Sequence, residues 1–248
     1  YQSVEERKLI IENVMAAAKG KLTVINHVAC NNTKDSVELA KHSESVGVDA
    51  IASIPPIYFR LPEYSIAAYW NAISEAAPNT DFVIYNIPQL TGFNLSPELL
   101  AEMSKNPKVV GVKNSAEPVY LMERYRQAAG DDFIIFNGSD EQFVGGRLMG
   151  ADAGIGGTYG CMPELFVELD RLVNENKIEE AQALQFKIND CIFALLSCKS
   201  LYGAAKKVMS MRFGIACGDP RSPFLPVTDE EARPVAEKIN KYVAELNK

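Results

Sequence analysis

Short apolar runs of strand length alternate along most of the chain with stretches whose apolar residues recur at helical spacing. The runs predict strands at 22–28, 50–56, 81–88, 109–115, 133–140 and 153–159. Each of them follows a segment with the periodicity of an amphipathic helix. Strands and helices that alternate at this short spacing indicate parallel strands joined by right-handed crossovers. The pattern therefore predicts an α/β fold.

Local signals at the helix ends support these elements. Ser3 and Glu6 have the spacing of a capping box, and Ser96 stands before a proline that suits the first helical position. A faint repeat, Gly-x-Asp-Ala, occurs at 47–50 and again at 150–153. In both copies the glycine suits the left-handed end of a helix just before a strand. The repeat indicates a duplicated βα unit, as in a barrel.

The pattern changes after residue 159, where only helical spacing remains. Helices are predicted at 162–175, 178–198 and 200–213. A last helix is predicted to begin near Thr228, capped together with Glu231, although Pro234 could shift its start. We therefore expect two regions, a βα region over 1–160 and a helical region over 161–248 packed on it.

The strand count leaves the architecture open at this point. A closed (β/α)8 barrel needs eight strands, and the pattern predicts six, with the chain opening directly on a helix. Either the fold is an open doubly wound sheet, or two βα units are missing from its front.

Composition excludes several classes of protein. The 248 residues carry a formal net charge of −7, which argues against a nucleic-acid-binding surface. No apolar run approaches the roughly 18–20 residues of a membrane span. The five cysteines are scattered, and His27 and His42 are the only histidines, so a zinc site is not expected. We expect a cytoplasmic protein with reduced thiols and no bound metal.

One lysine stands out against its surroundings. Lys113 ends the apolar run Val109–Val112, where a buried charge would be costly. In one interpretation the side chain packs along its stem and its ammonium group reaches water. In the other it is a Schiff-base lysine, kept neutral and nucleophilic because the neighbouring valines exclude water. The second interpretation suits its position, since α/β barrels carry their chemistry at the carboxyl ends of strands.

Three further predicted strands end in residues with possible chemistry. Tyr85 ends one, Asp140 and Glu141 follow another, and Gly156 and Gly157 lie in the last. Each has an ordinary structural explanation: a packed aromatic ring, a charge pair at a helix start, and a turn. Their shared place at strand ends favours a common site.

Taken in order, four motifs resemble one family. They are Tyr-Asn-Ile-Pro at 85–88, Gly-Val-Lys at 111–113, Asn-Gly-x-Asp-Glu at 137–141 and Gly-Ile-Gly-Gly-Thr-Tyr at 154–159. The set resembles the N-acetylneuraminate lyase subgroup of the dihydrodipicolinate synthase and N-acetylneuraminate lyase family of class I aldolases. The resemblance extends over nearly the whole chain.

The resemblance implies a (β/α)8 TIM barrel with C-terminal helices, a homotetramer, and catalysis without a cofactor. It also accounts for the strand count. In that family a strand and a Gly-Gly-Ser-Ser/Thr-Gly-Glu loop, which holds the substrate carboxylate, precede the segment that resembles residues 1–7. These 248 residues do not contain that motif. We therefore expect an N-terminally truncated barrel whose first two strands are absent from this sequence.

The resemblance also implies roles for individual residues in cleaving N-acetylneuraminate to N-acetylmannosamine and pyruvate. Lys113 is expected to form the iminium with the C2 ketone, and Tyr85 to move the proton of the C4 hydroxyl. A free phenol has a pKa of about 10 and is a poor base at neutral pH, so Tyr85 would need help from a nearby charge. Substrate contacts are expected from Ser115, Gly138, Asp140, Glu141 and Gly157. Tyr58 resembles an aromatic residue that reaches a neighbouring subunit's site.

Two departures bear on the substrate. Leu90 stands where dihydrodipicolinate synthases carry an arginine that binds a carboxylate, and those synthases lack the pair Asp140 and Glu141. A neutral polyhydroxy aldehyde product therefore fits better than an amino-acid semialdehyde. Gly157 stands where some family members have serine, which leaves only backbone binding there.

Alternative functions remain at this point. They are a 2-keto-3-deoxy sugar-acid aldolase, a dihydrodipicolinate synthase-like enzyme, an inactive fragment without the carboxylate-binding loop, and an open α/β binding domain. The last has no Gly-x-Gly-x-x-Gly motif to support a dinucleotide site. Small molecules are the expected partners, with neither nucleic acid nor a membrane.

Overall fold

A computed structural model describes residues 1–246; positions 247 and 248 of the predicted helical region lie outside the described residues. The chain divides into two compact units. The first comprises Tyr1–Gly138 and Met149–Asp152, and the second comprises Ser139–Leu148 and the residues from Ala153 onward.

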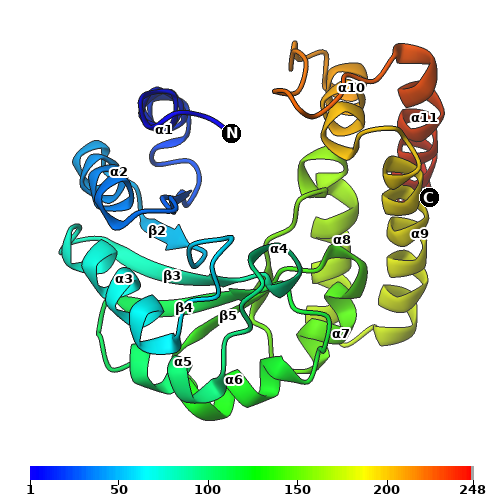
Figure 1. Cartoon of the computed structure of the whole chain (residues 1–248). Coiled ribbons are helices and arrows are strands. Elements are labelled where there is room, and N and C mark those ends of the chain that lie inside the picture. Colours follow the sequence, from blue (N-terminus) through cyan, green and yellow to red (C-terminus); the bar gives the residue numbers. More distant parts are fainter. Residues whose placement is uncertain (247–248) are drawn as a thin grey trace. The chain divides into compact units, whose positions relative to one another are not determined.

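The first unit contains a parallel sheet in which each strand pairs with the next in the sequence. Its strands are β1 (Ile25–His27), β2 (Ala50–Ser53), β3 (Asp81–Asn86), β4 (Val109–Asn114) and β5 (Ile134–Asn137). Its helices are α1 (Val4–Ala18), α2 (Thr33–Val46), α3 (Glu63–Glu75), α4 (Pro88–Thr91), α5 (Pro97–Met103) and α6 (Leu121–Ala129). Figure 1 shows β3, β4 and β5 side by side, with α3, α5 and α6 along one side of the sheet. The predicted alternation of parallel strands and helices is confirmed.

The two faces of this sheet bury different side chains. One face packs large residues such as Phe82, Ile84 and Ile135 against the helices, in a core that includes the fully buried Trp70. The other face carries a small cluster built on Ala50, Ala52 and Val83, against which Ile25, Val110 and Phe136 pack. The buried residues on this second face are therefore smaller than those on the first.

The capping residues predicted from the sequence form their hydrogen bonds at the helix starts. Ser3 caps α1 and accepts from the backbone N–H of Glu6, whose carboxylate accepts from the backbone N–H of Ser3 at 2.7 Å. Ser96 caps α5 in the same way, through the backbone N–H of Leu99 at 3.0 Å. These caps form because a helix start leaves backbone N–H groups without partners inside the helix.

The Gly-x-Asp-Ala repeat has the same structure in both copies. Gly47 and Gly150 have left-handed φ values of 79° and 104°. Asp49 accepts from the backbone N–H of Val24, and Asp152 accepts from that of Ile135, both at 2.7 Å. Each aspartate therefore ties the start of its own strand segment to the preceding strand. The repeat marks a duplicated βα unit, as predicted.

The strands are shorter than predicted, mainly at their carboxyl ends. The run predicted to end at residue 88 ends at Asn86, because Pro88 begins the short helix α4. The last predicted strand, 153–159, is reduced to β6 (Ala153–Gly154), and Tyr159 begins a 3-10 turn. Residues expected inside strands thus lie in loops, where they are free to face a ligand.

The second unit is mostly helical. After η1 (Asp140–Gln142) come α7 (Phe143–Leu148), η2 (Tyr159–Cys161), α8 (Pro163–Asn174), α9 (Ile178–Leu196), α10 (Leu201–Phe213) and α11 (Asp229–Leu246). In Figure 1, α9 lies beside α8 and α11, in agreement with their contacts. The predicted cap of Thr228 with Glu231 is present, and Pro234 lies inside α11 without shifting its start.

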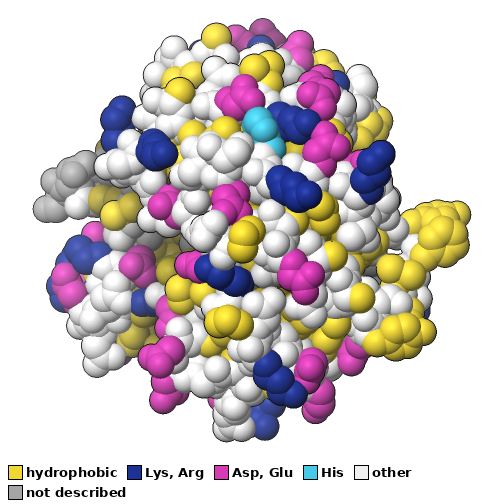
Figure 2. All heavy atoms as spheres, turned by 90° about the vertical axis from the view of Figure 1, so that its left-hand side faces the viewer, with side chains coloured by type: hydrophobic (Ala, Val, Ile, Leu, Met, Phe, Trp, Pro, Cys, Tyr) yellow, Lys and Arg dark blue, Asp and Glu magenta, His cyan; other side chains and the backbone are white. Residues whose placement is uncertain are grey.

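The surface of the first unit mixes charges of both signs. Figure 2 shows acidic and basic side chains intermingled on the face that carries α1 and α2, where Lys8 pairs with Glu38 at 2.5 Å. Within residues 1–246, no helix is both long enough and apolar enough to cross a membrane.

Candidate active site

A β-bulge between β3 and β4 determines which side chains face each other. Phe82 pairs with Val109, but the next residue, Val83, pairs with Gly111, so Val110 is an extra residue in β4. Because side chains alternate along a strand, one extra residue reverses which face each later residue points to. From the bulge onward Lys113 pairs with Tyr85. The bulge therefore puts both side chains on the face that is lined by small residues.

Lys113 and Tyr85 form a close pair at this end of the sheet. The Lys113 Nζ atom lies 4.2 Å from the centroid of the Tyr85 ring, and both side chains are half-buried. Val109 and Val112, expected to exclude water from the amine, pack instead in the helix-covered core on the opposite face. Val110 packs on the face that carries Lys113, and the phenol ring of Tyr85 lies against the lysine. This arrangement sets an amine beside a phenol, two kinds of group that can form a Schiff base and transfer a proton.

Gly138 and Ser115 complete this part of the site. A Cβ atom on Gly138 would lie 2.0 Å from the Oγ atom of Ser115 and 3.0 Å from the Cε atom of Lys113. The backbone N–H of Gly138 donates to the carbonyl of Asn114 at 2.8 Å, which fixes this close approach. Only glycine fits here without displacing the lysine or the serine. The first unit thus brings together Lys113, Tyr85, Ser115 and Gly138.

A buried amide network braces the pair from the opposite face of the sheet. The Nδ2 atom of Asn86 donates to the Oδ1 atom of Asn114 at 2.8 Å and to the hydroxyl of Tyr125 at 3.2 Å. The Tyr125 hydroxyl donates in turn to the carbonyl of Leu95 at 2.9 Å. Asn86 and Asn114 each follow a residue of the reactive pair directly in the sequence. Their satisfied hydrogen bonds hold the backbone of that pair in place.

His27 is a neighbour of the pair that the sequence analysis did not include in the site. Its ring meets the ring of Tyr85 edge-on, with centroids 6.1 Å apart and an angle of 86°. Burial, with the charges of Arg7 and Lys113, lowers the pKa of His27 to about 4, so the imidazole is neutral at neutral pH. Its Nε2 atom faces the backbone N–H of Ile54 at 3.3 Å, which assigns the ring proton to Nδ1. The one feature of the sequence that could have indicated His27 as a site residue is its place at the end of the first predicted strand.

The second unit contains the predicted carboxylate pair and the glycine segment. Asp140 is buried, and its Oδ2 atom accepts from the backbone N–H of Thr158 at 2.7 Å and from its hydroxyl at 2.5 Å. Glu141, the next residue, is exposed. A Cβ atom on Gly157 would meet nothing within 4 Å, so this position faces open space. The turn presents one fixed and one solvated carboxylate beside an open backbone segment.

Gly156 and Gly157 provide a matched pair of substitutions. A Cβ atom on Gly156 would lie 2.0 Å from the Oδ1 atom of Asp140. We expect Gly156→Ala to lower the free energy of unfolding by about 2 kcal/mol, because a crowded side chain must move. Gly157→Ala should change it by less than about 0.5 kcal/mol. Urea unfolding of the two variants checks this, and equal effects would contradict the geometry of the turn.

The other residues named from the sequence lie on the surface of the first unit. Leu90 is 71% exposed in α4. Tyr58 is 89% exposed, and its φ of 88° lies in the left-handed region that a tyrosine rarely adopts.

Residues 1–246 contain no group of three or more His, Cys, Asp or Glu side chains that could hold a metal ion. All five cysteines are free thiols, and burial raises the pKa of Cys161 to about 11.

Comparison with known proteins identifies the family. The model of the Dihydrodipicolinate synthetase family matches residues 1–242. The chain belongs to this family. An N-acetylneuraminate lyase of Mediterraneibacter gnavus is 57% identical over 238 residues, which is 96% of this chain and 76% of that protein. An N-acetylneuraminate lyase of Rhizobium meliloti is 34% identical over 98% of this chain and 80% of its own length.

Solved structures agree with this family assignment. The wild-type sialic acid aldolase of Ruminococcus gnavus is 54% identical and superposes with a TM-score of 0.96 over 99% of this chain and 83% of that chain. A variant of 2-keto-3-deoxygluconate aldolase from Sulfolobus solfataricus is 26% identical, with a TM-score of 0.87 over 99% of this chain and 81% of its own. The TIM-barrel fold of the family, followed by a helical C-terminal part, is therefore the fold class of this chain.

Proposed function

We propose that the protein is a Schiff-base aldolase that cleaves N-acetylneuraminate to N-acetylmannosamine and pyruvate. The observation that supports this most directly is the close pair of Lys113 and Tyr85 on neighbouring strands. The relatives named N-acetylneuraminate lyase, one of them 57% identical, support the choice of substrate.

In the proposed mechanism Lys113 carries the covalent steps. Its neutral amine adds to the C2 ketone of the open-chain sugar acid. The hydroxyl of the resulting carbinolamine takes a proton from solvent and leaves as water, which gives an iminium. The C3–C4 bond then breaks, and its electron pair moves into the iminium to form an enamine of pyruvate. Protonation of the enamine at C3 and addition of water release pyruvate and restore the amine.

Tyr85 carries the proton in this proposal. Its phenol first gives its proton to water, and the phenolate then accepts the proton of the C4 hydroxyl while the C3–C4 bond breaks, so that N-acetylmannosamine leaves as an aldehyde. The ring of Tyr85 lies against the lysine, and a positive iminium nitrogen at that position favours the phenolate. Neutral His27 adds no charge beside the iminium.

The remaining predicted residues are proposed to bind the substrate. Ser115 and Gly138 would contact the sugar near C4. Asp140, Glu141 and the backbone at Gly157 would bind the polyol tail, since carboxylates accept hydrogen bonds from hydroxyl groups. We also propose that residues 1–160 form a partial (β/α)8 barrel of six βα units, with the helical region 161–248 packed on it. A cytoplasmic homotetramer, with Tyr58 reaching a neighbouring subunit, completes the proposal.

A comparison of two substrates tests the proposed specificity. We expect kcat/KM for N-acetylneuraminate to exceed that for 2-keto-3-deoxygluconate by about 100-fold, because unpaired polar groups in the tail site penalise the shorter acid. The structural likeness to 2-keto-3-deoxygluconate aldolase makes that acid the relevant competitor. A preference for it would reverse the assignment, and no turnover of either acid would favour an inactive fragment.

A further inference from the structure

Two side chains of α9 hold the turn that carries Asp140 and Glu141. The Nε2 atom of Gln185 donates to the carbonyl of Asp140 at 3.1 Å. The Nδ2 atom of Asn189 donates to the carbonyl of Glu141, also at 3.1 Å. Residues four apart lie on the same face of a helix, so α9 presents both amides to two successive carbonyls. The turn is therefore held through its backbone, and these two hydrogen bonds use no carboxylate oxygen.

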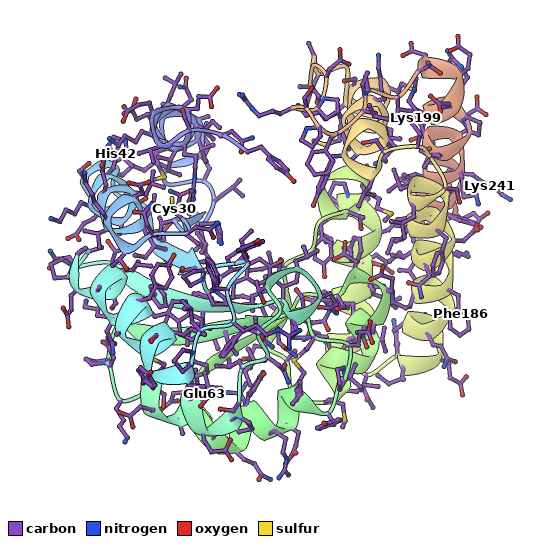
Figure 3. The ribbon with its side chains drawn as sticks, in the orientation of Figure 1. Cys30, His42, Glu63, Phe186, Lys199 and Lys241 are labelled. Atoms are coloured by element: carbon purple, nitrogen blue, oxygen red, sulfur yellow. The ribbon has the colours of Figure 1, made fainter. Side chains whose placement is uncertain are left out.

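The burial of Gln185 and its other hydrogen bonds hold its side chain against the carbonyl of Asp140. Its side chain is 5% exposed, whereas the next residue, Phe186, projects outward from α9 and is 64% exposed (Figure 3). The Oε1 atom of Gln185 accepts from the backbone N–H of Val144 at 3.1 Å, in the first turn of α7, where N–H groups lack helical partners. Its second amide hydrogen goes to the Oδ1 atom of Asn189 at 2.8 Å. The side-chain amide of Gln185 thus links α9 both to the turn and to the start of α7.

Asp140 is held on its other side as well. Thr158 donates two hydrogen bonds to the Oδ2 atom, while the backbone of Gly156 stands close to the Oδ1 atom. With its carbonyl fixed by Gln185 and one carboxylate oxygen fixed by Thr158, Asp140 keeps a single orientation. Recognition of hydroxyl groups needs such precision, since a shift of about 0.5 Å degrades a binding contact.

We infer that Gln185 and Asn189 are positioning residues that set the specificity for a long polyhydroxy tail. This inference deepens the proposed function and rests on it. The two residues hold the turn that is proposed to read the tail, whereas the covalent chemistry belongs to Lys113 and Tyr85 on the strands of the first unit. They should therefore affect the binding of long substrates and leave iminium formation unchanged.

The test compares substitutions on α9. Gln185→Met keeps the volume and removes every hydrogen bond of the amide, and Gln185→Glu keeps only the acceptor that faces Val144. Gln182→Met is the matched control, because Gln182 is an exposed glutamine of the same helix. The measurements are kcat and KM for N-acetylneuraminate and for 2-keto-3-deoxygluconate, and the yield of the borohydride-trapped pyruvate adduct on Lys113.

We expect both Gln185 variants to raise KM for N-acetylneuraminate about ten-fold, the effect of losing one well-placed hydrogen bond. KM for the shorter acid and the yield of adduct should stay within about two-fold of the wild type, and Gln182→Met should match the wild type. Equal losses for both substrates, or a proportional fall in adduct, would show a merely structural role and overturn the inference. If the wild-type protein does not cleave N-acetylneuraminate, the proposed function itself is refuted.

Discussion

Replacement of Lys113 by methionine is expected to lower kcat for N-acetylneuraminate by about 10⁴-fold or more, as removal of a catalytic nucleophile does. Methionine keeps most of the stem that packs beside Tyr85 and Gly138 but has no amine to form the iminium. Without the iminium the electrons of the C3–C4 bond have no acceptor. A coupled assay of pyruvate release measures the effect.

Lys105→Met is the control for this substitution. The Lys105 side chain is 72% exposed and forms an ion pair with Glu102 near the end of α5. Such surface pairs contribute less than about 1 kcal/mol, so the control should keep wild-type activity and stability. Activity of Lys113→Met above about one hundredth of the wild-type value would contradict the proposed nucleophile.

Tyr85→Phe should have the second-largest effect and a different signature. Removal of the hydroxyl group alone should lower kcat about 10²–10³-fold, the usual contribution of a positioned proton-transfer group. The remaining ring still covers Lys113 and meets His27 edge-on, so the pyruvate adduct should still form. Steady-state kinetics together with borohydride trapping separate the two steps.

Two outcomes would contradict this role of Tyr85. If Tyr85→Phe cleaves the sugar acid at the wild-type rate, the phenol does not move the proton. If the variant loses the adduct in proportion to kcat, Tyr85 acts on iminium formation and not on cleavage of the C3–C4 bond. His27→Gln serves as a comparison, because it removes the imidazole ring that meets the Tyr85 ring and keeps the phenol itself.

Much of the fold could be predicted because its signals are local. The caps at Ser3, Ser96 and Thr228 depend on residues three positions away, and all three are present. The two aspartates of the repeat make the same hydrogen bond in both copies. Strand ends were predicted less well, since apolar residues such as Ile54 and Ile87 continue the pattern into loops.

The candidate site was only partly predictable. Strand-end positions pointed to Lys113 and Tyr85, but the bulge at Val110 that makes them face each other depends on the register of the neighbouring strand. No local pattern in β4 encodes that register. For the same reason the valines expected to exclude water from the lysine lie on both faces of the sheet: Val109 and Val112 pack on the helix-covered face, and Val110 on the other.

Residues that act through distant contacts were missed altogether. His27 lies 58 positions before Tyr85 in the sequence, although the two rings are in contact. Gln185 contacts the carbonyl of Asp140 across 45 positions. In the sequence Gln185 looks like any polar residue of an amphipathic helix. Its role follows only from its burial and its three hydrogen bonds.

Reductive trapping tests the central claim most directly. The protein is incubated with pyruvate and borohydride, digested, and analysed by mass spectrometry. We predict one reduced pyruvate adduct per chain, located on Lys113 and lost in Lys113→Met. An unmodified Lys113 in a folded sample, or a stoichiometric adduct on any other lysine, would contradict the account.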